Sequence, residues 1–401
     1  MALTPIIILL FIGYIIFTID KKKENFPVPA ILTLVGIGLF FVPYFSQVEV
    51  TPNIIYHVLL PGLLFTSAYQ FPIDAFKQHG GLISFLATIG IVITVLMLGA
   101  AIFALAGLFT SLSFIGALLI ATMLTPTDPV SVTAILQQSS REPLVANVLE
   151  GESLINDGTS IVLFTVILSI FLENSALSFT QVLWEFAYVS FGGTAIGFLG
   201  GWLFSKAIHL THERDYQVML SIVVAYGTFN VAEYMGFSGV LATVSAGMML
   251  SFEFGRLIKE EHFRDALDNF WRIVEVSVLS ILFLLIGLVA ADYLSFNYWV
   301  LGILIFTVSI GIRCFLIITT TQFFSNWRRK IGWKTATILS WSGIKGAVSV
   351  FMILSVKEAG SGTETDLIIS LTFAALLLSL VIQSIGVYPL SKKLLRLSPK
   401  W

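Results

Sequence analysis

The feature that most constrains this chain is a series of apolar stretches, each long enough to cross a lipid bilayer as a helix. A helix needs about 17–25 apolar residues to span the hydrocarbon core. Applying this length gives about thirteen spans, with soft boundaries. They are approximately 2–19, 28–45, 53–70, 82–108, 111–138, 146–172, 184–205, 216–235, 237–252, 270–291, 298–323, 333–356 and 366–389. The sequence therefore predicts an all-α polytopic membrane protein, because a helix satisfies its own backbone hydrogen bonds in lipid.

Composition favours the same class and excludes several others. The 401 residues are 57% hydrophobic and 11% charged, whereas soluble domains carry about 25% charged residues. The first apolar stretch lacks a basic leader and a cleavage site, so we expect it to be retained as a span. A single cysteine, Cys314, excludes a disulfide framework. No basic run is long enough to indicate nucleic-acid binding, and the pair His209 and His212 lies in a charged loop typical of solvated side chains.

The positions of the basic residues predict the orientation in the membrane. Of the 22 Lys and Arg residues, 19 follow odd-numbered predicted spans, one (Lys357) follows an even-numbered span, and Arg313 and Lys345 lie within spans. Cytoplasmic loops carry an excess of Lys and Arg. We therefore expect the N-terminus outside and the C-terminus in the cytoplasm. After Pro389 only a short basic tail follows, so we expect no soluble regulatory domain.

Two predicted spans are interrupted by helix-breaking residues. The fifth contains Thr125–Pro129, whose two prolines leave the carbonyls of Thr122 and Thr125 without helical partners. The twelfth contains Ser342–Gly346, a glycine-rich break that holds Lys345. These breaks are seven spans apart, which predicts two inverted six-helix repeats, 1–6 and 8–13, joined by the seventh span. Paired discontinuous helices in inverted repeats indicate the midplane site of a transporter.

The sixth span carries a polar stretch where hydrocarbon is expected. Gly151–Gly158 contains Glu152, Ser153, Asn156 and Asp157, and ionisable groups at that depth mark ion or proton pathways by default. Ser153 and Asp157 are four residues apart and share a helix face. Glu152 and Asp157 are separated by roughly 140° around the helix, so they cannot point into one small site. We interpret Asp157 as the working carboxylate.

Other polar residues within the spans have two readings each. Asp128 precedes a proline and suits an N-cap, but the same position places its carboxylate beside freed carbonyls, where it can bind a cation. Ser153 and Thr127 can supply oxygen ligands or serve only as packing hydroxyls. Glu152 faces away from Asp157 and is the natural partner of Arg313, in a structural ion pair. Lys345 can offset the dipoles of two half-helices.

Three stretches, Thr127–Val130, Gly151–Gly158 and Ser342–Val348, follow one another along the chain. Weaker matches are Phe270–Trp271 with Phe283–Gly287, and Ser238–Ala242. In this order the stretches resemble the monovalent cation/proton antiporter superfamily, in the branch of bacterial NhaP-type antiporters and sodium/proton exchangers. The match covers nearly the whole chain, which makes it far more specific than any single motif.

The resemblance implies a function for these residues. The acid at Asp157 would hold Na⁺ or a proton in turn, and residues matching Asp128, Thr127 and Ser153 would line the same site, with no cofactor. Asn156 stands where electrogenic members have a second aspartate, which implies electroneutral exchange. The residues resembling Glu152 and Arg313 pair in the family.

The resemblance also implies an architecture. A single antiporter domain, 1–401, would work by alternating access as a homodimer in the lipid of the cell membrane, in sodium transport and pH homeostasis. Core helices, about 82–172 and 298–389, would move against scaffold and dimer helices, about 2–70 and 184–291.

Two departures from the family pattern affect the choice of ion. Thr66 stands where a glutamate is usual, and Lys345 replaces an arginine. K⁺/H⁺ exchange, or transport of Li⁺, therefore stays open. A cation channel is a less favoured alternative, and it would carry current with unsaturated flux. An enzyme is disfavoured because no nucleophile–base or metal-ligand pair is evident.

Overall fold

The computed structural model describes residues 3–20, 27–45, 50–128, 144–173, 178–207, 213–254, 261–294, 298–328 and 331–395. Within these ranges the chain is helical and has no β-strand. The helices up to the middle of the chain are α1 (Leu3–Asp20), α2 (Val28–Phe40), η1 (Ile54–Leu59), α3 (Leu60–Gln70), α4 (Ile73–Phe85), η2 (Leu86–Gly90), α5 (Ile91–Ala106), α6 (Phe114–Met123), α8 (Leu144–Glu173) and α9 (Phe179–Ala207). The remainder are α10 (Arg214–Tyr234), α11 (Gly239–Phe254), α12 (Glu261–Ala291), α13 (Trp299–Phe323), α14 (Ser325–Arg328), α15 (Trp333–Trp341), α16 (Ala347–Ala359), α17 (Thr363–Leu378), η5 (Ser379–Gln383) and α18 (Ser384–Leu395).

Each predicted span overlaps at least one helix, so the all-helical membrane class is confirmed in its main feature. Within the described residues, six helices are long and apolar enough to cross a membrane by themselves. The number of crossings, thirteen, and the inverted repeats stay predictions. The second half of the fifth predicted span, 129–138, lies outside the described residues, as do Lys21–Lys23 and the pair of histidines in the charged loop.

Two helices begin earlier than the apolar pattern indicates. The fourth predicted span starts at 82, whereas the continuous helix Ile73–Ala106 includes α4, η2 and α5. The tenth starts at 270, whereas α12 begins at Glu261. Hydropathy marks only the apolar part of a helix, because polar residues with high helix propensity extend it without lowering its stability.

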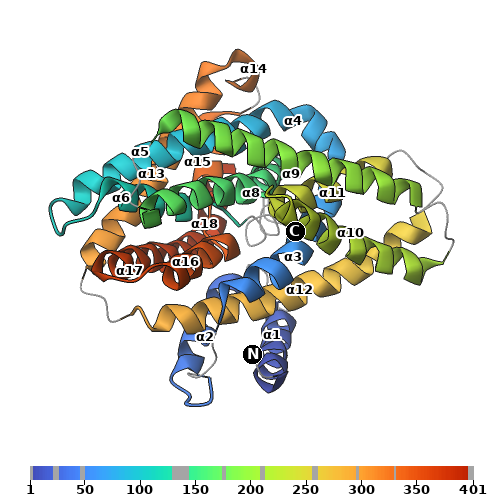
Figure 1. The fold of residues 1–401 in the computed structure, drawn as a ribbon, viewed down its shortest axis with the longest axis horizontal. Helices are drawn as coiled ribbons and strands as arrows, with labels where there is room; N and C mark the ends of the chain where they lie inside the picture. Colours follow the sequence, from blue (N-terminus) through green and yellow to red (C-terminus); the bar gives the residue numbers. More distant parts are fainter. Residues whose placement is uncertain are drawn as a thin grey trace.

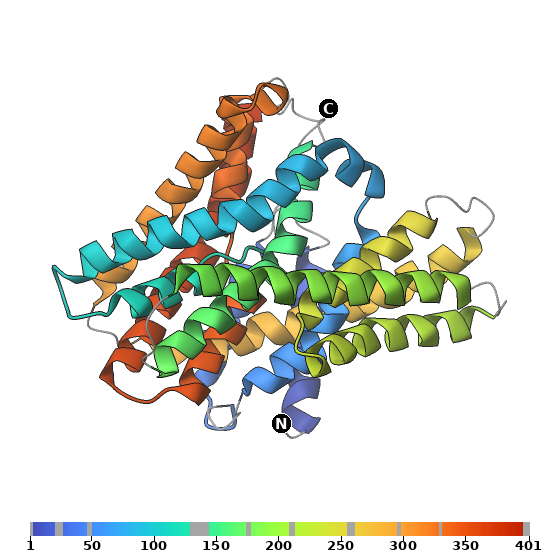
Figure 2. The same ribbon diagram turned by 45° about the horizontal axis from the view of Figure 1, so that its top comes forward.

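The helices pack in two groups, and Figure 1 shows α10 and α11 of the first on the right and α6 and α17 of the second on the left. In one group α12 packs on α2 and α3, and α11 packs on α3, α9 and α10. In the other, α5 packs on α6, α13 packs on α15 and α17, and α16 packs on α17. Figure 2 shows α9 and α10 side by side within the first group. The helix α8 contacts both groups, through α9 and α11 on one side and α4 and α6 on the other.

Aromatic and polar contacts join the two groups beyond α8. The ring of Tyr56, in η1, stacks on Phe351 of α16 with centroids 4.4 Å apart. The Tyr56 hydroxyl donates a hydrogen bond of 2.7 Å to Glu233 of α10, which also accepts from the Gly239 N–H at 2.7 Å. The groups are therefore in direct contact around α8.

Candidate functional site

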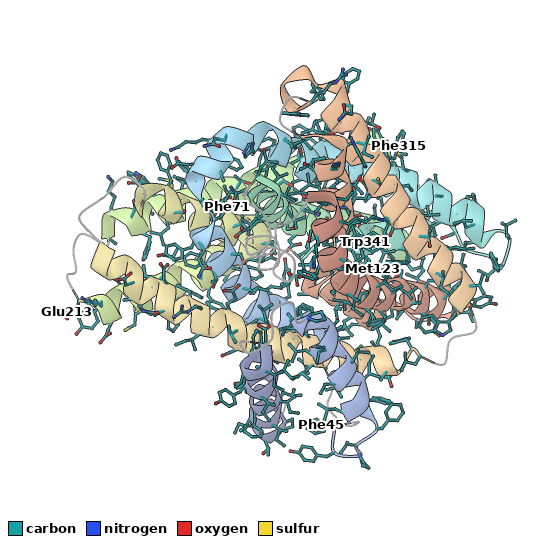
Figure 3. All side chains as sticks on the ribbon, turned by 180° about the vertical axis from the view of Figure 1, so that it is seen from behind. Phe45, Phe71, Met123, Glu213, Phe315 and Trp341 are labelled. Atoms are coloured by element: carbon teal, nitrogen blue, oxygen red, sulfur yellow. The ribbon has the colours of Figure 1, made fainter. Side chains whose placement is uncertain are left out.

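Two interrupted helices meet beside α8. The half-helix α6 ends at Met123 and α15 ends at Trp341, and Figure 3 shows both residues to the right of the centre when the molecule is seen from behind. The non-helical segments that follow are joined by a hydrogen bond of 2.7 Å from the Asp128 N–H to the Ile344 carbonyl. A Cβ at Gly346 would lie 2.6 Å from the Cβ of Asp128, so only glycine permits this close approach. The breaks predicted from proline and glycine are thus in contact.

The polar stretch of α8 supports the first break. The Asn156 amide donates to the Thr125 carbonyl at 3.2 Å and to the Thr127 hydroxyl at 3.4 Å. Its own oxygen accepts from Ser160 at 2.7 Å. The Thr125 carbonyl is one of the two that the prolines were predicted to free, and Asn156 gives it a buried partner. Asn156 therefore fixes the position of this segment.

A small cavity lies on one face of this arrangement. It holds about 30 Å³ of free space, close to the volume of one water molecule in the liquid. Carboxylates and hydroxyls line one wall, and apolar residues of α3 line much of the other. The lining residues are Leu60, Leu63, Leu64, Ser67, Pro126, Thr127, Asp128, Ser153, Leu154, Asp157, Gly346, Ala347 and Val348. All four residues predicted to bind the transported cation are therefore brought together.

The cavity offers oxygen atoms to a hard cation. Thr127 Oγ1 and Ser153 Oγ are 2.8 Å apart, and both side chains are buried. Asp157 and Asp128 add carboxylates from α8 and from the first break. Among the described residues no Lys or Arg forms an ion pair with Asp157. Carboxylate and hydroxyl oxygens are ligands that hard cations prefer.

The other face of α8 carries a closed ion pair. Arg313 of α13 donates to both carboxylate oxygens of Glu152, at 2.9 Å and 2.8 Å. Glu152 is 4% exposed, and the Arg313 side chain is 13% exposed. A Cβ at Gly343 would lie 2.5 Å from Arg313 Nε, so the second break rests directly on the guanidinium. Two parallel charge-assisted hydrogen bonds give this pair a fixed geometry.

A second cavity of about 20 Å³ separates this pair from Lys345. Its polar lining consists of Thr94, Thr125, Glu152, Asn156, Ser309, Arg313 and Lys345. Lys345 is buried, and Arg313 already donates to both oxygens of Glu152, the acid in the lining of this cavity. Lys345 therefore lies where the sequence predicted it, in the second break, but on the far side of α8 from Asp157.

The second break is held by a side chain that the sequence analysis did not single out. Gln383 donates to the Trp341 carbonyl at 2.7 Å, an orphan acceptor at the end of α15. It also accepts a short hydrogen bond from Ser379, whose hydroxyl in turn accepts from the Lys345 N–H at 3.1 Å. Ser379 and Gln383 bound the π-helical segment η5. A glutamine within an apolar span was the signal that could have found it.

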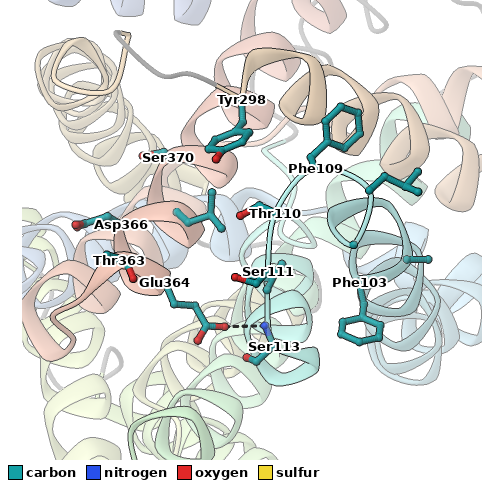
Figure 4. Close-up of a pocket in the computed structure, with 15 residues that line it drawn as sticks. Phe103, Phe109, Thr110, Ser111, Ser113, Tyr298, Thr363, Glu364, Asp366 and Ser370 are labelled. Carbon is teal, nitrogen blue, oxygen red and sulfur yellow. Dashed lines mark hydrogen bonds between the residues drawn. The ribbon is translucent and has the colours of Figure 1, made fainter.

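A much wider hollow lies elsewhere and contains none of the predicted site residues (Figure 4). It is a wide opening of about 1560 Å³ between the loop 107–113 and the start of α17. Its carboxylate Glu364 accepts from the Ser113 N–H at 2.8 Å, so it joins the first turn of α17 to the start of α6. Its acids therefore occupy helix N-termini, where negative charge is stabilised.

Two interrupted helices whose breaks meet beside a polar helix are typical of one class of membrane protein. In secondary transporters, discontinuous helices place unpaired backbone and polar side chains around a site inside the membrane. The fold and the first cavity together are typical of that class of polytopic membrane protein.

The chain belongs to the family described as "Sodium/hydrogen exchanger, transmembrane", whose sequence model matches residues 6–393. The Na⁺/H⁺ antiporter ApNhaP of Aphanothece halophytica is 31% identical over 382 residues, which cover 94% of this chain and 71% of that protein. The Na⁺/H⁺ antiporter NhaH of Halobacillus aidingensis is 28% identical, with 97% of each chain covered. The structure of the sodium proton antiporter MjNhaP1 from Methanocaldococcus jannaschii shares the fold, with a TM-score of 0.79, 21% identity and 98% of each chain covered.

Proposed function

We propose that this protein is an electroneutral Na⁺/H⁺ antiporter in which Asp157 binds either a cation or a proton. Membership of the family and the named Na⁺/H⁺ antiporters among its relatives support the exchange itself. The observation that carries the role of Asp157 is the contrast within α8. Glu152 is occupied by Arg313, whereas Asp157 faces a cavity of oxygen atoms with no ion-pair partner among the described residues.

The chemistry of exchange follows from one shared carboxylate. An ionised Asp157, with oxygens of Asp128, Thr127 and Ser153, provides a site for a partly dehydrated monovalent cation. A protonated Asp157 loses the charge that holds the cation, so the proton and the cation exclude one another. Each transport cycle then returns one proton for one cation, which requires no net charge movement.

Alternating access requires two groups of helices that move relative to one another, and the packing suggests which helices belong to each group. We propose that the group containing α5, α6, α8, α13 and α15–α18 moves as the core against the group containing α1–α3 and α9–α12. The cavity of Asp157 lies between α3 of one group and α8, α16 and the non-helical segment after α6 of the other. Movement of the core would therefore open this cavity to one side of the membrane and then to the other.

The proposal includes the orientation in the membrane, the oligomeric state and the transported ion. The distribution of Lys and Arg supports thirteen spans in the cell membrane, with the N-terminus outside and the C-terminus in the cytoplasm. The protein would function as a homodimer. Na⁺ is the proposed ion, because the named relatives are Na⁺/H⁺ antiporters, and Li⁺ and K⁺ are the alternatives.

Asp157→Asn tests this proposal directly. The variant preserves the shape of the side chain and removes its titrating group, so we expect proton-coupled Na⁺ flux in proteoliposomes to fall to the background level. Ser160→Ala, one turn away on the same helix, is the matched control and should retain exchange. Monodispersity of both purified variants shows that they fold. Proton-coupled flux that survives in Asp157→Asn would assign the proton to another group.

A further inference from the structure

One face of α3 forms the wall of the Asp157 cavity that belongs to the other helix group. Leu60, Leu63, Leu64 and Ser67 are spaced by three, four and seven residues and therefore share a side of the helix. Three of them are apolar. Ser67 is the polar side chain that α3 presents to the cavity, and the lining residues opposite it include Asp157, Asp128 and Ser153.

The neighbouring hydroxyl of Thr66 has a different environment. Thr66 is fully buried, and its hydroxyl donates a hydrogen bond of 2.7 Å to the Gly62 carbonyl of the same helix. This is the local bond that Ser and Thr commonly make within helices. Thr66 does not line the cavity, so it contributes no ligand there.

Ser67 makes no such bond. Its hydroxyl forms no hydrogen bond with another residue in the part of the chain that the structure describes, although Thr33, Thr88 and Thr94 bond to their own helices. It is partly exposed, whereas every residue from Leu59 to Thr66 is buried. The free space in the cavity is small, about 30 Å³, and residues of both helix groups line it. An ion bound there would contact both walls.

We propose that the Ser67 hydroxyl is a ligand of the transported monovalent cation, contributed by α3 from across the boundary between the two helix groups. This inference rests on the proposed function and adds a binding residue to the same site. The hydroxyl carries no charge, so it completes the coordination of the ion without adding a third carboxylate. The helix that carries Ser67, α3, packs on α11 and α12. Ser67 would therefore keep its position in the membrane when the core moves.

The test compares Ser67→Ala with Thr66→Val in proteoliposomes, by measuring the KM for Na⁺ at high pH together with the maximal rate. Losing one neutral ligand of roughly hydrogen-bond strength should raise the KM of Ser67→Ala by about 3–10-fold. The maximal rate should stay within about twofold, and Thr66→Val should keep the KM of the original protein. Ser67→Thr retains a hydroxyl and should restore most of the affinity, whereas Ser67→Cys replaces it with a soft sulfur and should not.

Binding supplies a second measurement that does not depend on exchange. Na⁺ that binds the folded state raises the melting temperature in detergent, and this shift should be smaller in Ser67→Ala and Ser67→Cys than in Thr66→Val. A KM and a melting shift in Ser67→Ala equal to those of Thr66→Val would overturn the role of Ser67. Absence of exchange in the unmodified protein would instead overturn the proposed function, and the melting shift would still decide whether Ser67 binds the ion.

Discussion

The two faces of α8 each carry an acid, but the two acids have different neighbours. Each face carries an acid beside a broken helix, and each acid lies next to a cavity of roughly one water molecule's volume. Glu152 is bound by both arms of the Arg313 guanidinium. Asp157 has hydroxyls and a second carboxylate around it instead. The negative charge of Glu152 is therefore neutralised by Arg313, whereas no Lys or Arg among the described residues forms an ion pair with Asp157.

This contrast separates an acid with a structural ion pair from the acid that we propose binds the transported ions. A buried charge is tolerated when a partner with good geometry replaces the water it has lost. Arg313 is that partner for Glu152, and Gly343 allows the second break to rest on the guanidinium. For Asp157 no such partner occurs among the described residues, and in the proposed cycle a proton or a bound cation takes its place. The two acids thus differ in partner and not in chemical type.

The largest expected effect on stability comes from breaking the ion pair. Glu152→Gln or Arg313→Ala alone leaves a buried charge uncompensated, which should cost about 3–5 kcal/mol of folding free energy. Both single variants should lose folded yield and melting temperature. The double variant should lose less than the sum of the two, because neither charge is then left alone. Additive losses would show that the two charges do not stabilise one another.

A smaller effect is expected at Asn156, which lies between the two faces. Asn156→Leu removes the donor to the Thr125 carbonyl and the acceptor for Ser160, and unsatisfied buried groups cost about 1–3 kcal/mol. Ser160→Ala removes only the second of these bonds, so its melting temperature should fall by less. A loss in Asn156→Leu no greater than that in Ser160→Ala would mean that Asn156 does not support the first break.

The sequence predicted much of this arrangement because the strongest signals are local. Hydropathy locates the helices, and proline or glycine at membrane depth locates both breaks. The helical angle between Glu152 and Asp157 already sends them to different sides of α8. The resemblance added the assignment of Thr127, Asp128 and Ser153 to the neighbourhood of Asp157, and the structure brings these residues to the same cavity.

The features that the sequence did not predict depend on which distant helices meet. Gln383 is the last residue of the π-helical segment η5, and its contact with Trp341 depends on this segment lying beside the second break. Thr159 donates to the Ala87 carbonyl at 2.6 Å, and Ala87 lies in another such segment, η2. Ser67 and Thr66 are adjacent hydroxyls, and only the packing of α3 determines which one faces the cavity. Helix ends such as Glu261 were placed too late because hydropathy does not register polar turns.

The central claim is that the cation and the proton compete for Asp157, and the dependence of KM on pH tests it most directly. The measurement is the Na⁺ KM in proteoliposomes with both membrane faces held at the same pH. If the cation binds only the ionised carboxylate, the KM should rise about tenfold for each pH unit well below the pKa of Asp157, and it should become constant above that pKa. The maximal rate should decline at high pH, because fewer protons are available to return. A KM that does not change between about pH 5 and pH 9 would contradict competition at this carboxylate.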